Sequence, residues 1–395
     1  MRVLIVTSRF PLPPWRGNQV RTVEWLRALD RAERGLVCLA PPSQAGGAEL
    51  AELTERVWSY RIPPPESLPR IVAAVAAGRP AQEGLYATRS ARRVVSEAAR
   101  SFRPEVVVVQ MVRCAWALEP VLSVVPRAAV VFDAIDAMSL HFDRAAGSVA
   151  LPLRPLFRAE AERCRRREAE LAARAHRVTA VCERDLAALS APAERGRVEP
   201  VSGPTLERSN PDPTRPTILL SGNLGYRPTV AGARWFAEHV WPLLVRRVPG
   251  VRWLLVGARP NRAVRRLAES PGIELHADVG DLAPYLAQTT AAIAPLSTGS
   301  GIPMKVLEAW AAGVPVVADQ WAASGLDREG AAAVVAASAR DEWVTALERL
   351  LTDPEAAESL GNRGHDLWAA RYRFDRIAEA VRGVVSEAAR SVNSI

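Results

Sequence analysis

The chain has 395 residues, of which 49% are hydrophobic and 24% charged. This composition is typical of folded globular proteins and excludes disorder as the main state. The length predicts two or three domains, each large enough to bury its own core. The formal net charge is +8, but Lys305 is the single lysine among 51 basic residues. The arginine excess therefore reflects a general replacement of lysine, and we expect no nucleic-acid partner.

The four cysteines, Cys38, Cys114, Cys164 and Cys182, are far apart and form no CxxC spacing. This pattern favours a reducing compartment and argues against a zinc site. The first apolar run ends at Ser8, which makes it too short for a signal peptide, and no run approaches the length of a membrane span. We therefore expect a cytoplasmic protein without a bound metal.

Short β-branched runs alternate with longer segments of helical spacing through the first half of the chain. Continuous apolar strands between amphipathic helices indicate a parallel sheet that is covered on both faces. The expected strands are 3–6, 36–39, 106–109, 128–132 and 178–181, and a helix is expected over 20–29.

A proline-rich polar stretch then interrupts the alternation, and we interpret 201–216 as an interdomain linker. Strands are expected again at 217–220, 251–256, 273–276, 291–294 and 314–318, with one helix over 230–247. The sequence thus predicts an α/β protein with two doubly wound, Rossmann-like domains, over 1–200 and 217–375. Ligands of such domains bind beyond the carboxyl ends of the strands.

The stretch from Pro295 to Ala318 is the most informative one. A glycine-rich turn, Gly299, Ser300 and Gly301, follows a strand and precedes a helix. Such a turn directs backbone N–H groups at one point, with the positive end of the helix dipole behind them, and this arrangement binds anions such as phosphate. Lys305 lies in the first turn of the same helix, where its ammonium reaches an anion held by the turn.

Glu308 follows Lys305 by almost one helical turn. A carboxylate repels phosphate, so we expect it to accept hydrogen bonds from hydroxyls of the same ligand, such as a ribose. A ligand with a diphosphate and a ribose is a nucleotide. The structural alternative is that the turn only connects a strand to a helix and that Lys305 is a solvated surface residue. The retention of a lysine here argues against that alternative, because arginine replaces a compact charge poorly.

The segment 299–318 resembles the donor-binding motif of GT-B glycosyltransferases of the family 4 type (glycosyl transferases group 1). Residues 221–228 resemble the strand and glycine turn that open their C-terminal domain, 254–257 their central strand, and 279–286 their segment at the nucleobase. Residues 10–21 resemble the loop after the first strand in members that act on polysaccharides and natural products.

The resemblance implies two domains facing across a cleft and a final helix, 376–395, that crosses back to the N-terminal domain. It also implies metal-independent, retaining transfer of a sugar from a nucleotide diphosphate donor to an acceptor hydroxyl, without a further cofactor. Lys305 and the 299–301 turn would neutralise the diphosphate, with Arg227 as a further cation. Gly222, Val279 and Glu308 would contact the donor.

The chain departs from the family pattern at two places. Ser300 stands where the first of two paired glutamates normally touches the sugar, and the usual histidine after the fourth strand is replaced by the run Phe132 to Asp136. Asp133 or Asp136 would orient a sugar or acceptor hydroxyl, or would cap a helix. We therefore treat Lys305, Asp136 and Ser300 as candidate catalytic residues.

Other single residues carry weaker signals. Gly17 is a candidate for close approach of a donor phosphate, and Arg21 is a candidate phosphate contact. His141 and Asp133 are candidates for acceptor binding, and Tyr226 is a candidate for stacking on the ligand. The other histidines are expected to be structural.

Segment 151–177 contains eight arginines and four glutamates. It is either a basic helix that touches anionic lipid or a solvated helix with Arg–Glu pairs; we favour the latter. The apolar positions Leu153, Leu156, Phe157, Cys164 and Leu171 are expected to form a core-facing stripe.

The sequence predicts a glycosyltransferase that acts on a small-molecule, lipid-linked or glycan acceptor. We expect it in the cytoplasm, either free or in peripheral contact with the membrane through 151–177. The alternatives are a nucleotide-sugar epimerase on the same fold and a non-catalytic nucleotide-binding homologue. The absent first glutamate and histidine are the main support for the non-catalytic alternative.

Overall fold

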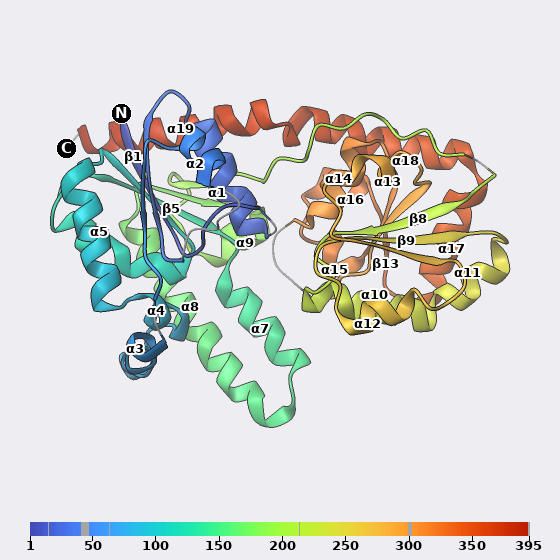
Figure 1. Cartoon of the computed structure of the whole chain (residues 1–395), viewed down its shortest axis with the longest axis horizontal. Helices are drawn as coiled ribbons and strands as arrows, with labels where there is room; N and C mark the ends of the chain where they lie inside the picture. The colour runs from blue at the N-terminus through green and yellow to red at the C-terminus, as the bar shows by residue number, and fades with distance from the viewer. Residues whose placement is uncertain (15, 41–46, 63, 213, 299–301, 394–395) are drawn as a thin grey trace. The chain divides into compact units, whose positions relative to one another are not determined.

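The computed structural model describes residues 1–14, 16–40, 47–62, 64–212, 214–298 and 302–393. The chain divides into two compact units (Figure 1). The N-terminal unit contains Met1–Val201 together with Ile377–Ile395, and the C-terminal unit contains Ser202–Arg376.

The N-terminal unit is built on a seven-stranded parallel sheet with the order β3-β2-β1-β4-β5-β6-β7. Its strands are β1 (Arg2–Thr7), β2 (Glu33–Cys38), β3 (Arg56–Ser59), β4 (Val106–Gln110), β5 (Ala129–Ile135), β6 (Arg177–Ala180) and β7 (Gly196–Val198). Its helices are α1 (Gly17–Ala28), α2 (Gly47–Leu53), α3 (Pro64–Ala76), α4 (Ala81–Tyr86), α5 (Arg89–Phe102), η1 (Val112–Ala117), α6 (Leu118–Leu122), α7 (Met138–Ser148), η2 (Leu151–Leu153), α8 (Arg154–Arg174), α9 (Glu183–Ala188) and α19 (Phe374–Asn393).

The C-terminal unit is built on a six-stranded parallel sheet with the order β10-β9-β8-β11-β12-β13. Its strands are β8 (Thr217–Ser221), β9 (Arg252–Gly257), β10 (Ile273–Ala277), β11 (Ala291–Ala294), β12 (Val316–Asp319) and β13 (Val335–Ala337). Its helices are α10 (Arg227–His239), α11 (Trp241–Arg247), α12 (Arg262–Leu267), α13 (Ala283–Leu286), α14 (Met304–Ala311), α15 (Gln320–Ala323), α16 (Arg328–Ala332), α17 (Arg340–Thr352), α18 (Pro354–Leu367) and the π-helical turn η3 (Trp368–Tyr372).

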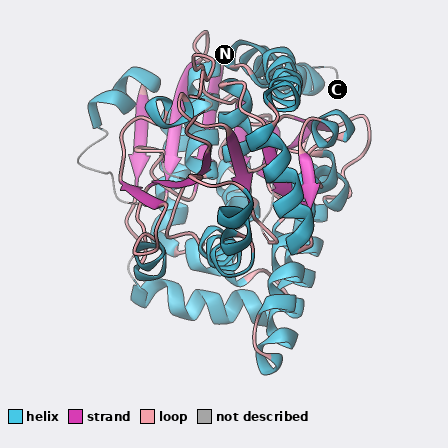
Figure 2. Ribbon diagram, turned by 90° about the vertical axis from the view of Figure 1, so that its right-hand side faces the viewer, coloured by secondary structure: helices cyan, strands magenta, loops and turns pink. Residues whose placement is uncertain are grey.

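Apolar cores lie on both faces of each sheet, and Figure 2 shows helices on either side of the strands. β4 and β5 are buried at every position, as expected for parallel strands that are covered twice. The side chains of Ile377, Val381, Val384 and Val385 place α19 in the core that also holds Trp25 of α1. The predicted α/β class with two doubly wound sheets is confirmed.

The structure corrects one predicted helix and adds three strands. The expected helix over 230–247 is two helices, α10 and α11, because Pro242 in the first turn of α11 cannot continue a preceding helix. β3, β7 and β13 were not predicted. Each has three or four residues and largely lacks a buried apolar run, so periodicity does not reveal it.

All four cysteines are buried and free. Burial raises the pKa of the Cys38 and Cys114 thiols to about 12. These thiols are therefore apolar packing groups rather than nucleophiles at neutral pH. None of the helices in the described residues is long and apolar enough to cross a membrane.

The loops after β8 and β9 touch through their backbones. A Cβ added to Gly257, whose φ is +147°, would lie 1.8 Å from the carbonyl oxygen of Gly222. The Gly222 N–H donates to Val256 O at 3.0 Å, and the Ala258 N–H donates to Gly222 O at 3.1 Å. Only glycine fits at position 257, and this contact sets the position of the turn at Gly222.

We expect Gly257→Ala to destabilise the C-terminal unit by more than about 3 kcal/mol, because a steric overlap adds to the cost of roughly 1–2 kcal/mol for a left-handed residue. Gly250→Ala is the matched control, because its φ is +79° and nothing lies within 4 Å of its Cβ. Urea unfolding of both variants measures the difference. Equal losses would contradict the role of the backbone contact.

Candidate functional site

The candidate site in the C-terminal unit lies at the carboxyl edge of its sheet. β8 ends at Ser221, and Gly222 follows with a φ of +116°. Lys305 and Glu308 project from the first two turns of α14, which begins at Met304. The Ser221 hydroxyl donates to Glu308 Oε2 at 2.7 Å, and a Cβ on Gly222 would lie 3.6 Å from Lys305 Nζ. The structure therefore brings together four residues from two segments far apart in the sequence.

Lys305 and Glu308 are half-buried and share a poorly solvated environment. Loss of water lowers the pKa of the Lys305 ammonium, an effect that the charge of Glu308 opposes. Loss of water likewise raises the pKa of the Glu308 carboxyl, while the Ser221 hydroxyl and Lys305 oppose the shift. Both groups gain from a polar ligand that replaces the missing water: an anion for the ammonium and hydroxyl donors for the carboxylate.

Further residues predicted to bind the nucleotide-sugar donor lie on the same edge of this sheet. Arg227 is the first residue of α10 and is exposed, and Tyr226 before it is 45% exposed. Val279 follows β10 and packs, half-buried, against the core that contains α14. The anion-binding turn Gly299, Ser300 and Gly301 lies outside the described residues, so its predicted role remains a prediction.

Sequence reasoning missed Ser221 as the residue that orients Glu308. The available signal was a polar residue that follows the apolar run Ile218 to Leu220 and immediately precedes a glycine. It also missed the role of Gly257 in placing Gly222. That role depends on a contact between two loops, which a single sequence does not reveal.

Asp133, predicted to bind an acceptor or to cap a helix, does neither, because it lies inside a fully buried polar network. Its carboxylate accepts hydrogen bonds from Thr179 Oγ1 at 2.8 Å, Gln110 Nε2 at 3.1 Å and the Arg21 guanidinium at 3.4 Å. The side chains of Asp133 and Arg21 are both 0% exposed.

The predicted phosphate contact of Arg21 is also corrected. Arg21 donates to Glu24 Oε2 at 3.2 Å and to the carbonyl of Pro200 at 2.8 Å. The negative charges of Asp133 and Glu24 outweigh the loss of water and raise the pKa of Arg21. Arg21 is therefore a structural cation that joins α1 to β5 and to the end of the N-terminal segment.

The other candidates of the N-terminal unit lie at the carboxyl edge of its own sheet. Gly17 begins α1 and is exposed, and a Cβ there would meet nothing within 4 Å. Asp136 follows β5 and is half-buried. His141 lies one turn into α7, where loss of water and the charges of Arg113 and Arg144 lower its pKa. The lowered pKa favours the neutral form of the His141 imidazole.

The start of α7 is held by Glu168, which is 1% exposed. Its carboxylate accepts the N–H groups of Met138 at 2.7 Å and Ser139 at 3.4 Å. Burial raises its pKa to about 7, although these hydrogen bonds lower it. The helix that carries His141 is therefore anchored by a carboxyl group that titrates near neutral pH.

The remaining histidines make local contacts. His176 Nδ1 accepts the Val130 N–H, His239 stacks on Trp235, His276 lies against Tyr285, and His365 contacts the carbonyls of Trp310 and Ala311 at the end of α14. Among the described residues, no three His, Cys, Asp or Glu side chains form a metal-binding group.

We expect Asp133→Ala to lower the free energy of unfolding of the N-terminal unit by about 3–5 kcal/mol, because it leaves the buried Arg21 without its main partner. Asp143→Ala is the control, because the Asp143–Arg165 pair is more than 40% exposed on both sides and its loss costs less than about 1 kcal/mol. Urea denaturation followed by circular dichroism compares the two. A small loss for both would show that the network contributes little.

Glu168→Gln should change how stability depends on pH. The folded-state pKa of about 7 lies above the ordinary value of 4.5, so the folded state binds the proton more tightly and wild-type stability falls as pH rises between these values. Glutamine does not titrate, so the variant should gain roughly 3 kcal/mol relative to wild type between about pH 4 and pH 8. Glu170→Gln, at a side chain 61% exposed, should show no such change. A flat difference for Glu168→Gln would contradict the raised pKa.

Comparisons with known proteins identify one segment of the chain as similar to a glycosyltransferase family. Residues 215–353 match the family model described as glycosyl transferases group 1. No curated protein sequence matches the chain.

Three solved structures illustrate the similarity of the whole fold. Anabaena Alr3699/HepE, crystallised with UDP and glucose, has a TM-score of 0.69 at 12% identity, covering 98% of this chain and 99% of that one. Sucrose-phosphate synthase from Thermosynechococcus elongatus has a TM-score of 0.70 at 15% identity, covering 99% and 100%. The Escherichia coli protein described as trehalose-6-phosphate bound with UDP-2-fluoro glucose has a TM-score of 0.65 at 14% identity, covering 99% of each chain. The chain therefore has the GT-B fold, and its segment 215–353 is a domain of the glycosyl transferases group 1 family.

Proposed function

We propose that this glycosyltransferase transfers a sugar from a uridine diphosphate sugar to an acceptor hydroxyl, with retention at the anomeric carbon and without a bound metal or other cofactor. The main supporting observation is that Lys305 and Glu308 lie beside Ser221 and Gly222. These residues gather at the carboxyl edge of the sheet, in the segment that matches the group 1 family model. Two of the similar structures named above hold UDP with glucose or UDP-2-fluoro glucose, which supports uridine as the nucleoside of the donor.

Each residue has a distinct part in this proposal. Lys305 and the 299–301 turn neutralise the diphosphate, with Arg227 as an exposed cation on the same edge. The Ser221 hydrogen bond occupies one oxygen of Glu308 and leaves the other to accept the ribose hydroxyls. Gly222 lets the ligand approach Lys305, since a side chain there would touch Nζ. Val279 borders the base.

The chemical step breaks the bond between the anomeric carbon and the leaving phosphate oxygen and forms a bond to the acceptor oxygen. The acceptor proton moves to the departing phosphate oxygen, so the step requires no separate base. Charge builds on the diphosphate as the bond breaks, and a cation held beside it lowers the barrier. Asp136 and Ser300 are proposed to orient sugar or acceptor hydroxyls, and His141 to border the acceptor. The open backbone at Gly17 is proposed to let the donor phosphate or the acceptor approach.

The acceptor is proposed to be a small molecule, a lipid-linked precursor or a glycan, and the enzyme is proposed to act in the cytoplasm. Of the two interpretations of 151–177, the structure supports Arg–Glu pairing along the body of α8. Arg163 pairs with Glu160, and Arg167 pairs with Glu170. The paired arginines in the body of α8 therefore leave any membrane contact of this segment to its first residues, 151–158.

Glu308→Ala should weaken UDP binding by about 10- to 100-fold, the cost of losing charge-assisted hydrogen bonds. Lys305→Ala should lower kcat by about 100-fold or more, and should change affinity less, because its charge matters most as the phosphate leaves. Calorimetric titration with UDP and the slow hydrolysis of UDP-sugars, both with chelator present, measure the two effects.

Glu358→Gln, an exposed position on α18, is the control and should behave as wild type. Unchanged binding and turnover in both site variants would overturn the assignment. Conversion of the donor to an isomeric sugar would instead identify an epimerase, and binding without turnover of any donor would identify a non-catalytic protein.

A further inference from the structure

Helix α3 presents an apolar face to solvent. The exposed residues of this helix are Pro65, Leu68, Pro69, Val72, Ala73, Val75 and Ala76. Leu68 is 64% exposed and Val72 is 66% exposed. A surface helix normally turns its polar side outward, but here Ser67 is buried and Glu66 accepts a hydrogen bond from the Tyr60 hydroxyl at 3.0 Å. An apolar face of this kind marks an interaction surface.

A second exposed apolar group lies at the turn between α7 and α8. Leu151, Leu153 and Leu156 are 72%, 47% and 60% exposed. This corrects the expectation that Leu153 and Leu156 face the core, although Cys164 and Leu171 of the same helix are fully buried. Proline at 152 and 155 breaks the chain into a short turn and a new helix, and the leucines lie outside the packed part of α8.

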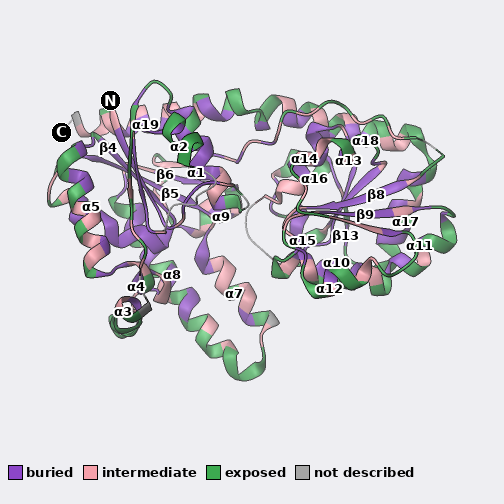
Figure 3. Cartoon of the chain, viewed as in Figure 1, coloured by how far each residue is buried: buried purple, intermediate pink, exposed green. Residues whose placement is uncertain are grey.

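The two apolar groups belong to one rigidly connected region of the N-terminal unit. Glu160 of α8 accepts the Ala81 N–H at the start of α4 at 2.8 Å. Arg167 of α8 pairs with Glu83 of α4 through two hydrogen bonds of 2.9 Å. In Figure 1, α3 and the α7–α8 turn lie on the same lower side of this unit, and Figure 3 colours much of both as exposed.

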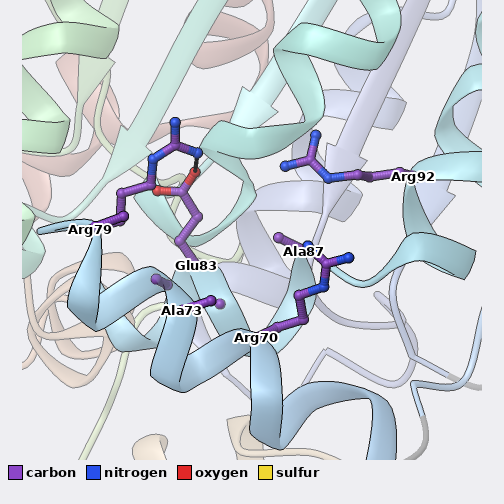
Figure 4. A pocket seen from close by; sticks show the side chains of 9 residues that line it. Arg70, Ala73, Arg79, Glu83, Ala87 and Arg92 are labelled. Atoms are coloured by element: carbon purple, nitrogen blue, oxygen red, sulfur yellow. Dashed lines mark ion pairs between the residues drawn. The ribbon is translucent and has the colours of Figure 1, made fainter.

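Positive charge surrounds these apolar groups. Segment 61–79 contains three arginines and one acidic residue, and 151–158 contains two arginines and no acidic residue. A pocket beside α3 has an alanine-rich wall and the arginines 70, 79 and 92 around it (Figure 4). Glu83, the one carboxylate that lines the pocket, bonds twice to Arg167 and lies 4.0 Å from Arg79, and Arg92 pairs with Glu119 at 3.2 Å. The arginines 70, 79, 92 and 167 therefore outnumber the two carboxylates, and the charge around the pocket is net positive.

We propose that α3 and the α7–α8 turn together form a docking face for an anionic lipid bilayer. The leucines and valines enter the boundary between headgroups and acyl chains, and the arginines bind lipid phosphates, with Arg70 and Arg79 at headgroup depth. Arginines near an anionic membrane are attracted by its negative surface potential, and salt screens this attraction. A second copy of the chain complements this face less well, because it would bring two arginine-rich rims together.

The proposal goes beyond the proposed function and does not depend on it. Wild-type protein should sediment with vesicles of phosphatidylcholine and phosphatidylglycerol at a 7:3 ratio, and hardly with phosphatidylcholine alone, and added salt should release it. Replacing Leu68, Val72 and Val75 together by serine should lower the partition coefficient by roughly tenfold or more. Leu151→Ser with Leu156→Ser should have a similar effect.

The matched control replaces Val57, Val198 and Val245 by serine, since these valines have exposed fractions of 41%, 38% and 40% elsewhere on the chain, and it should sediment as wild type. Unchanged UDP binding in every variant separates a failure of docking from a failure of the proposed function. No sedimentation of wild type, or equal sedimentation of the α3 variant, would overturn the proposal. The proposal would also be overturned if the wild-type protein formed a dimer in solution and the α3 substitutions made it monomeric. The face would then be an interface between two copies of the chain.

Discussion

The candidate donor site in the C-terminal unit depends on how closely the turn after β8 approaches the loop after β9 and helix α14. Gly257 allows the backbone of Gly222 to touch the loop after β9, and Ser221 at the end of β8 holds Glu308 on α14. These two contacts place the Lys305 ammonium and the Glu308 carboxylate beside the backbone of Gly222, which carries no side chain. All strands of the parallel sheet end at this edge, so the loops that follow them meet there. Gly222 and Gly257 let the backbones of two of these loops come into contact.

The N-terminal unit uses its polar residues in a different way. Arg21, Asp133, Gln110 and Thr179 satisfy one another inside the protein, so the most polar cluster near the end of β5 is structural. Buried charges persist only when they are paired, and Asp133 accepts hydrogen bonds from Arg21, Gln110 and Thr179. Asp136 and His141, the other candidates near this edge among the described residues, are half-buried.

The same unit also has a surface whose chemistry contrasts with that of the rest of the molecule. The arginines in the middle of α8 are paired with glutamates of the same helix, whereas the start of α8 and the outer face of α3 expose leucine and valine beside arginine. The contrast lies in which side chains meet solvent: paired charges along the body of α8, and apolar groups beside arginines at its start and on α3.

The sequence by itself determined the fold class, the strands with continuous apolar runs and the segment of α14 that carries Lys305 and Glu308, because periodicity and a single lysine among arginines are local signals. Only the tertiary structure decided which polar residues face a ligand. Asp133 and Arg21 looked like site residues and are buried partners, while Ser221 and Gly257 looked ordinary and position the site. The reason is physical: burial, pairing and close backbone approach depend on segments far apart in the chain, by 112 residues for Arg21 and Asp133, 87 for Ser221 and Glu308, and 35 for Gly222 and Gly257. No local pattern records which segments meet.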